Sequence, residues 1–362
     1  MTFKVKTKGQ IEGEKLLVPK LRFKEFNNEY KKYKIGDTLK VKSGKDQKLI
    51  ECINGKYPIL GTGGQIGTTN NFLYDKPSVL IGRKGTINKP QYMTTPFWTV
   101  DTLFYTDIKE GFNTKYIFYA FQNINWKKYD ESTGVPSLSC KTIEEILYYI
   151  PNKDEQDKIS TFITLLDKKI ELQQRRIEAL KIYKRRLIKK IFDDIKDNDS
   201  IRLKDLYHFA YGEGNTNPDN GGIYPVYGAN GKIGGFNKYN AEYSVIIGHM
   251  GAYAGNVLFE ENKHFVTYNG TIAIPKNIKI LRPKFGYYML LNTNLPRICA
   301  GSGMPFLSYE ILNNIKVKLP DIKAQEKCEK VLDKTEAKIK LEKRKFKNLS
   351  QLKKSLLQQM FI

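Results

Sequence analysis

Two loops of this 362-residue chain carry side chains suited to the edges of nucleic-acid bases. One follows the segment SVLIG at 78–82 and contains Arg83, Lys84, Asn88, Lys89 and Gln91. The other follows SVIIG at 244–248 and contains His249, Met250, Tyr253 and Asn256. Arginine and lysine hydrogen-bond guanine edges, and asparagine and glutamine pair bidentately with adenine. Both loops keep matching glycines (Gly82 and Gly248, Gly85 and Gly251), whereas the side chains between them differ. The pattern predicts one scaffold that presents two different base-reading surfaces.

Further candidates for DNA contact lie beside other glycine turns. They are Gln65, Ser137, Asn230, Lys232 and Ser302. Ordinary solvated loops, in which glycine supplies a positive φ, are the alternative interpretation for any one of these residues. Trp98 and Trp126 fit a hydrophobic core better than a base-stacking platform.

Motifs for catalysis are scarce. GTGGQIG at 61–67 has Ile66 where a dinucleotide-binding loop requires its last glycine, and the chain contains no GK[ST] of a P-loop. The four cysteines are far apart without a CxxC pair, and nothing groups Ser, His and Asp into a triad. We therefore expect a binding protein that is not an enzyme, with no catalytic residue, metal or cofactor in this chain.

The composition favours a basic, globular protein. Lys and Arg number 61 against 38 Asp and Glu, a formal net charge of +23, and so polyanions are the expected partners. A hydrophobic content of 40% with 12% aromatic residues argues against disorder. The opening MTFKVKTKGQ lacks an apolar core, no run approaches a membrane span, and isolated cysteines fit a reducing compartment. We expect a cytoplasmic protein without membrane contact.

The chain contains an internal repeat. YPILGTGGQIG at 57–67 matches YPVYGANGKIG at 224–234, and GVPSLS at 134–139 matches GMPFLS at 303–308. Pro151 and Gln156 correspond to Pro320 and Gln325. A period of 167 to 169 residues is far too long for a solenoid, so we infer two copies of one domain.

Each copy begins with short strands and turns and ends in a long charged stretch without Pro or Gly. We predict an α+β fold of two strand-rich, mixed α/β domains joined by two long helices. The expected boundaries are a first domain at 1–151, a helix at 152–195, a second domain at 196–320 and a helix at 321–362.

A heptad pattern in both long helices predicts an antiparallel coiled coil. The central seam residues are Ile170, Gln173, Ile177, Leu180, Lys184, Glu342, Phe346, Leu349, Lys353 and Leu356. In the predicted register Lys184 faces Glu342 and Gln173 faces Lys353, which avoids the repulsion of Lys184 by Lys353 in a parallel pair. The same register packs Leu180 on Phe346 and Ile177 on Leu349. Two amphipathic helices, each lying on its own domain, are the alternative.

The motifs resemble those of one protein family. VPKLRFKEF (18–26), SVLIGRKGTIN (78–88), FWTVDTLFY (97–105), GVPSLS and PNKDEQDKI (151–159) are similar to recurring segments of the specificity subunit of type I restriction-modification systems. The second copy departs from the first at Asn269-Gly270-Thr271, which we align with Val100-Asp101-Thr102, and at the looser helix entry DIKAQEK (321–327).

The resemblance implies that each copy is a target recognition domain that binds one half of a bipartite site in double-stranded DNA. The paired helices would set the length of the unspecified spacer. It further implies two methyltransferase subunits docked on the helices and endonuclease or translocase subunits, with S-adenosylmethionine, ATP and Mg on those partners.

Two other functions remain possible at this point. A self-contained nuclease with a diverged site predicts metal-dependent cleavage by the chain alone. A basic coiled-coil adaptor, or an architectural nucleic-acid-binding or RNA-binding protein without sequence specificity, predicts no preferred duplex sequence.

Overall fold

The computed structural model describes residues 3–5, 18–195, 199–214, 219–301 and 303–362. The chain divides into two compact units, which we call the first unit (1–174 with 345–362) and the second unit (175–344). Among the described residues, no helix combines the length and the apolar character needed to cross a membrane.

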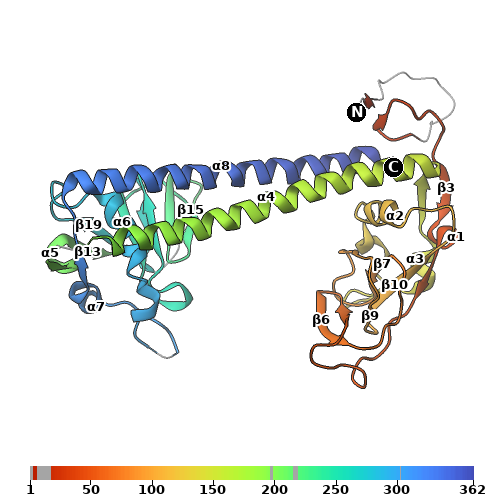
Figure 1. The fold of residues 1–362 in the computed structure, drawn as a ribbon, viewed down its shortest axis with the longest axis horizontal. Coiled ribbons are helices and arrows are strands. Elements are labelled where there is room, and N and C mark those ends of the chain that lie inside the picture. The colour runs from red at the N-terminus through yellow and green to blue at the C-terminus, as the bar shows by residue number, and fades with distance from the viewer. Residues whose placement is uncertain (1–2, 6–17, 196–198, 215–218, 302) are drawn as a thin grey trace. The chain divides into compact units, whose positions relative to one another are not determined.

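The first unit is built on two small sheets (Figure 1). A four-stranded sheet has the order β4 (Leu39–Lys42), β10 (Leu103–Ile108), β7 (Ser78–Gly82), β8 (Gln91–Met93). A three-stranded sheet has the order β6 (Gly64–Thr69), β5 (Tyr57–Gly61), β9 (Trp98–Thr99). The pairs β1 (Phe3–Val5) with β2 (Leu21–Phe23) and β3 (Lys31–Lys34) with β11 (Leu147–Ile150) complete the strands. The short helices are α1 (Ile35–Thr38), α2 (Thr114–Phe121) and α3 (Cys140–Glu145), with a 3-10 turn at Trp126–Tyr129.

The second unit repeats this plan. Its four-stranded sheet has the order β13 (Tyr207–Tyr211), β19 (Gly270–Pro275), β16 (Ser244–Gly248), β17 (Val257–Glu260). Its three-stranded sheet has the order β15 (Gly231–Phe236), β14 (Tyr224–Gly228), β18 (Phe265–Val266). Strands β12 (Ser200–Arg202) and β20 (Lys316–Lys318) form a further pair. Its helices are α5 (Leu203–Leu206), α6 (Pro283–Asn292) and α7 (Tyr309–Asn314), with 3-10 turns at Gly251–Tyr253 and Leu295–Ile298. Even the register shift in the hairpin recurs, at Ile59/Leu60 and Val226/Tyr227. The structure confirms the predicted repeat and fold class.

Two long helices follow the strand-rich parts, as predicted. They are α4 (Lys153–Asp193) and α8 (Ile322–Met360), of 41 and 39 residues. Each helix belongs to both units, because α4 enters the second unit at Arg175 and α8 enters the first at Lys345. Within each unit the two helix segments run antiparallel. In the second unit, for example, Arg176 pairs with Glu342 and Lys184 pairs with Glu336.

The predicted register of the seam is wrong. Every seam position named above is buried or half-buried. Lys184 pairs with Glu336 rather than Glu342, and Lys353 pairs with Asp167 at 2.7 Å rather than with Gln173. Glu342, which is 2% exposed, lies 3.7 Å from Arg176.

The predicted packing of Leu180 on Phe346 and of Ile177 on Leu349 is displaced accordingly. Leu180 lies between the pairs Arg176–Glu342 and Lys184–Glu336, which places it opposite Ile339. Lys184 and Lys353 in the seam reach carboxylates at its edge, and Arg176 at the edge reaches Glu342, so the charged layers need not face one another.

The far end of each long helix fills the core of the unit that it enters. Phe361, just after α8, stacks on Tyr116 of α2 with 5.1 Å between the ring centroids. Phe192 of α4 meets Phe285 of α6 at 5.3 Å in the second unit. Leu356, Leu357 and Met360 join the core of the first unit in the same way. Each unit therefore depends on residues that are distant in sequence.

A glutamine in the first turn of each long helix ties that helix to the short helix beside it. Gln156 accepts a hydrogen bond from the backbone N–H of Asn113 at 2.9 Å and donates one to the Pro151 carbonyl at 3.0 Å. Gln325 likewise accepts from the Arg282 N–H and donates to the Pro320 carbonyl. Both side chains are buried. This explains the repeated Pro and Gln of the sequence.

A buried ion pair closes the first unit at the start of α4. Arg22 donates to both carboxylate oxygens of Glu155, at 2.7 and 2.6 Å, and the two residues are 4% and 0% exposed. Burial disfavours the charge of Arg22, but the hydrogen bond and charge of Glu155 outweigh it and raise the pKa of Arg22.

Candidate nucleic-acid interface

In each unit, loops from four elements meet at one edge of the four-stranded sheet. Strand β10 runs antiparallel to both β4 and β7, so its beginning lies beside their ends. Backbone bonds hold these loops together in the first unit: Arg83 N–H donates to the Thr102 carbonyl at 2.8 Å, and Leu138 N–H donates to the Arg83 carbonyl at 2.9 Å. In the second unit His249 and Leu307 make the equivalent bonds, to Asn269 and His249. The two interfaces therefore share one backbone frame.

The glycines that recur in these loops are required by the backbone. Gly85 and Gly251 have φ of 80° and 77°, in the left-handed region that favours glycine. A Cβ at Gly82 would overlap the Thr86 carbonyl, and one at Gly248 would overlap the Tyr253 carbonyl. The glycine pattern thus reports the shape of the loop, and the variable side chains between the glycines are left to determine its chemistry.

In the first unit, most predicted contact residues lie at this edge. Lys84, Asn88 and Lys89 are exposed, and Lys84 forms a backbone bridge with Ser137. Arg83 is half-buried, and its guanidinium donates to the Asp101 carbonyl at 3.3 Å.

Gln91 has a structural role beside the nearby hairpin. Its side-chain amide donates to the Gly61 carbonyl at 2.9 Å and so holds the turn between β5 and β6. Gln65 is exposed just beyond that turn, and its amide donates to the Gly67 carbonyl at 3.3 Å.

In the second unit, some of the predicted contact residues are exposed, and others are buried or half-buried and hold the loops in place. Tyr253 is 49% exposed, and Asn230 and Lys232 are exposed at the hairpin. Asn256 donates to the Ala229 carbonyl at 2.8 Å, the equivalent of the contact that Gln91 makes. His249 is buried, with Nδ1 3.2 Å from the Leu307 carbonyl, so it supports the loop from beneath. Ser302 lies outside the described residues.

Sequence reasoning missed residues that come from the other loops of the same edge. In the second unit Tyr211 stacks on Tyr309, with ring centroids 4.0 Å apart and planes 17° apart, and Tyr268 lies beside them. Their counterparts in the first unit are Ser43, Cys140 and Asp101.

The backbone hydrogen bonds above pair Asn269 with Thr102, at an offset of 167 residues, which corrects the alignment of 269–271 with 100–102. Aligning the repeats loop by loop, with a separate offset for each, would have revealed these positions.

Burial opposes ionisation of the thiol and of two phenols at the interface. It raises the pKa of the Cys140 thiol, a shift that the hydrogen bond to Ser43 and the charge of Arg83 only partly oppose. Burial also raises the pKa of Tyr211 and Tyr309. These groups are therefore a thiol and phenols at neutral pH, suited to contact rather than to nucleophilic attack.

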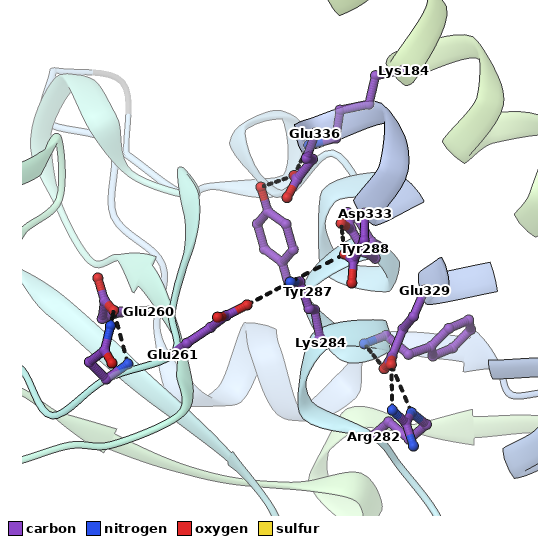
Figure 2. Close-up of polar contacts among 12 residues, drawn as sticks. Lys184, Glu260, Glu261, Arg282, Lys284, Tyr287, Tyr288, Glu329, Asp333 and Glu336 are labelled. Carbon is purple, nitrogen blue, oxygen red and sulfur yellow. Dashed lines mark hydrogen bonds and ion pairs between the residues drawn. The ribbon is translucent and has the colours of Figure 1, made fainter. Parts of the chain in front are cut away.

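A group of carboxylates lies elsewhere in the second unit, and its members bind nearby cations, a hydroxyl and a backbone N–H (Figure 2). Glu329 accepts from Arg282 at 2.8 Å and from the Phe285 N–H at 2.8 Å. Asp333 accepts from Tyr288 at 2.7 Å, and Lys284 bridges Asp333 and Glu261. Each of these three carboxylates is thus paired with a cation or a hydroxyl. The cluster fastens α6 to α8 and has the character of a structural network.

Comparison with known proteins gives matches over nearly the whole chain. The family model for the type I restriction modification DNA specificity domain matches twice, at residues 27–181 and 195–351. The specificity subunit of the type I restriction enzyme EcoprrI from Escherichia coli is 24% identical over 153 residues, which cover 41% of this chain and 38% of that protein. A putative type I specificity subunit of Mycoplasma pneumoniae is 25% identical over 220 residues, covering 57% of this chain and 81% of that protein.

Two solved structures share the fold. The S subunit of a type I restriction-modification system from M. genitalium superimposes with a TM-score of 0.67 at 20% identity, covering 95% of this chain and 99% of that one. A chain from a structure on complex assembly and conformational transition of a type I restriction-modification system gives a TM-score of 0.56 at 11% identity, covering 91% and 96%.

Proposed function

The chain belongs to the type I restriction modification DNA specificity family, and we propose that it is the DNA-recognition subunit of a type I restriction-modification complex, acting in the cytoplasm. Each unit binds one half of a bipartite site in double-stranded DNA. One observation carries this proposal: the same frame of loops and glycines recurs in both units, while the side chains displayed on it differ. A shared frame with different displayed groups suits two half-sites of different sequence.

The long helices set the length of the spacer between the half-sites. A helix of 41 residues is about 60 Å long at 1.5 Å per residue. That length corresponds to about 18 base pairs at 3.4 Å each. The buried seam makes the pair of helices stiff, as a ruler requires.

The catalytic steps belong to partner subunits. Two methyltransferase subunits dock on the helices and bring S-adenosylmethionine, and endonuclease or translocase subunits bring ATP and Mg. This chain supplies the recognition of sequence and is not itself an enzyme. The net charge of +23 supports binding to the phosphate backbone, which positions the complex without specifying bases. An adaptor without sequence specificity would not account for the different side chains on the shared frame.

Selection from a randomised duplex library tests the proposal. The chain would be co-expressed with its genomically adjacent methyltransferase, and bound DNA recovered at two salt concentrations. The proposal predicts two short fixed elements separated by a constant gap. Salt-sensitive recovery of unrelated sequences would contradict it and would favour the adaptor.

A further inference from the structure

Four positions at the loop edge are equivalent in the two units but differ in chemistry. They are Ser43, Arg83, Asp101 and Cys140 in the first unit, and Tyr211, His249, Tyr268 and Tyr309 in the second. Arg83 and His249 are equivalent because they make the same backbone hydrogen bonds. Ser43 and Tyr211 are each followed by a glycine in the same setting. A Cβ at Gly44 would overlap the Val100 carbonyl, and a Cβ at Gly212 would overlap the Thr267 carbonyl. Cys140 and Tyr309 both begin a helix capped by serine.

In the first unit one of these positions, Arg83, presents a cation. The Arg83 guanidinium is oriented by its hydrogen bond to the Asp101 carbonyl, and because a guanidinium has five N–H donors, others remain for a ligand. Its neighbours Ser43 and Cys140 are small, with Oγ and Sγ 4.0 Å apart. The adjoining bridge pairs Lys84 with Ser137, which adds further polar groups.

In the second unit the same positions form an aromatic surface. Tyr211 stacks on Tyr309 and lies 4.3 Å from the buried ring of His249, and Tyr268 is 40% exposed at the rim. The adjoining bridge pairs Met250 with Phe306, where the first unit has Lys84 and Ser137. Met304 and Phe306, 65% and 41% exposed, extend the apolar surface.

We propose that these four positions are the base-reading centre of each unit, and that they select guanine in the first half-site and thymine in the second. The inference rests on the proposed DNA-binding function and adds the base chemistry of each half-site. A guanidinium fork matches the O6 and N7 acceptors of guanine in the major groove. The exposed aromatic surface of the second unit instead favours the C5-methyl of thymine, the only methyl in the major groove of unmethylated DNA.

Transfer of the four side chains between the units tests this inference. One variant carries Tyr211→Ser, His249→Arg, Tyr268→Asp and Tyr309→Cys, and the same library selection is applied to it and to the wild type. The second half-site should change from thymine to guanine at one position, while the first half-site stays the same. A second half-site that keeps its original bases would overturn the inference.

Single variants keep the test valid if the fourfold variant does not fold. Arg83→Ala should reduce the preference for guanine in one half-site by about 10- to 100-fold. Lys109→Ala is the matched control, since exposed Lys109 follows β10 at the opposite edge of the same sheet. A bipartite motif whose bases are unaffected by Arg83→Ala would overturn the inference and leave the proposed function standing. Absence of any motif for the wild type would overturn both.

Discussion

Lys184 of α4 forms an ion pair with Glu336 of α8, and this contact defines the register of the helix pair in the second unit. The pair is half-buried, with side chains 17% and 32% exposed. Lys353 and Asp167 form the corresponding pair in the first unit. In both cases a lysine inside the seam binds a carboxylate at its edge, so neither lysine needs a charged partner directly opposite.

Disulfide trapping should distinguish this register from the one that the sequence suggested. Leu180→Cys with Ile339→Cys should cross-link readily, because Leu180 lies between two ion pairs that flank Ile339. Leu187→Cys with Ile339→Cys is the matched control, since it corresponds to the sequence-based register. Mass spectrometry of the cross-linked peptides measures the yields. A higher yield for the control pair would show that our register is wrong.

Loss of the buried ion pair should destabilise the first unit strongly. Glu155→Gln leaves the charge of Arg22 buried without its partner, and we expect the free energy of unfolding to fall by about 3–5 kcal/mol. Glu145→Gln, which removes a carboxylate from the exposed pair with Lys34, should have almost no effect. Urea unfolding compares the two. Equal effects of the two variants would refute the role assigned to Arg22 and Glu155.

The glutamine bonds at the start of the long helices should also be measurable. Gln156→Ala leaves the half-buried Asn113 N–H and the buried Pro151 carbonyl without this partner, at a cost of about 1–3 kcal/mol. Gln325→Ala should cost a similar amount, because it breaks the equivalent bonds in the second unit. Gln358→Ala, at an exposed position of α8, serves as the control. If Gln156→Ala unfolds at the same urea concentration as this control, the bonds contribute nothing.

Acid should destabilise the second unit through His264. Its ring is fully buried between Ser244 and the Asn262 carbonyl, and burial lowers its pKa below the ordinary 6.5, although the bond to Asn262 and the charge of Glu260 oppose the shift. As the pH falls, His264 therefore binds a proton more readily in the unfolded chain than in the folded protein. The stability present above about pH 6.5 is lost as the pH falls, by up to about 1.4 kcal/mol per pH unit.

His264→Phe should flatten this acid dependence. Phe97 occupies the equivalent buried position of the first unit, so a phenylalanine fits this position of the shared fold. Urea unfolding at pH 7.5 and pH 5 measures the effect. An unchanged difference between the two pH values would show that another group is responsible.

Regular patterns in the sequence predicted the repeat, the long helices and the seam. Glycines with positive φ and heptads of apolar residues are local signals, and the structure uses them as expected. The pairing of Arg22 with Glu155 could not be predicted, because 133 residues separate them and either could have been a solvated surface charge. The tyrosine surface was missed for a related reason. Tyr211, Tyr268 and Tyr309 come from three loops that only the folded sheet brings together.

The most direct test of the central claim is the gap between half-sites after both long helices are lengthened. One heptad inserted after Gln174 and another after Arg344 preserves the seam and adds about 10 Å, or about three base pairs. Library selection should then return the wild-type half-sites with a gap about three base pairs longer. The same half-sites at the wild-type gap would contradict the account, because the helices would then not set the spacing.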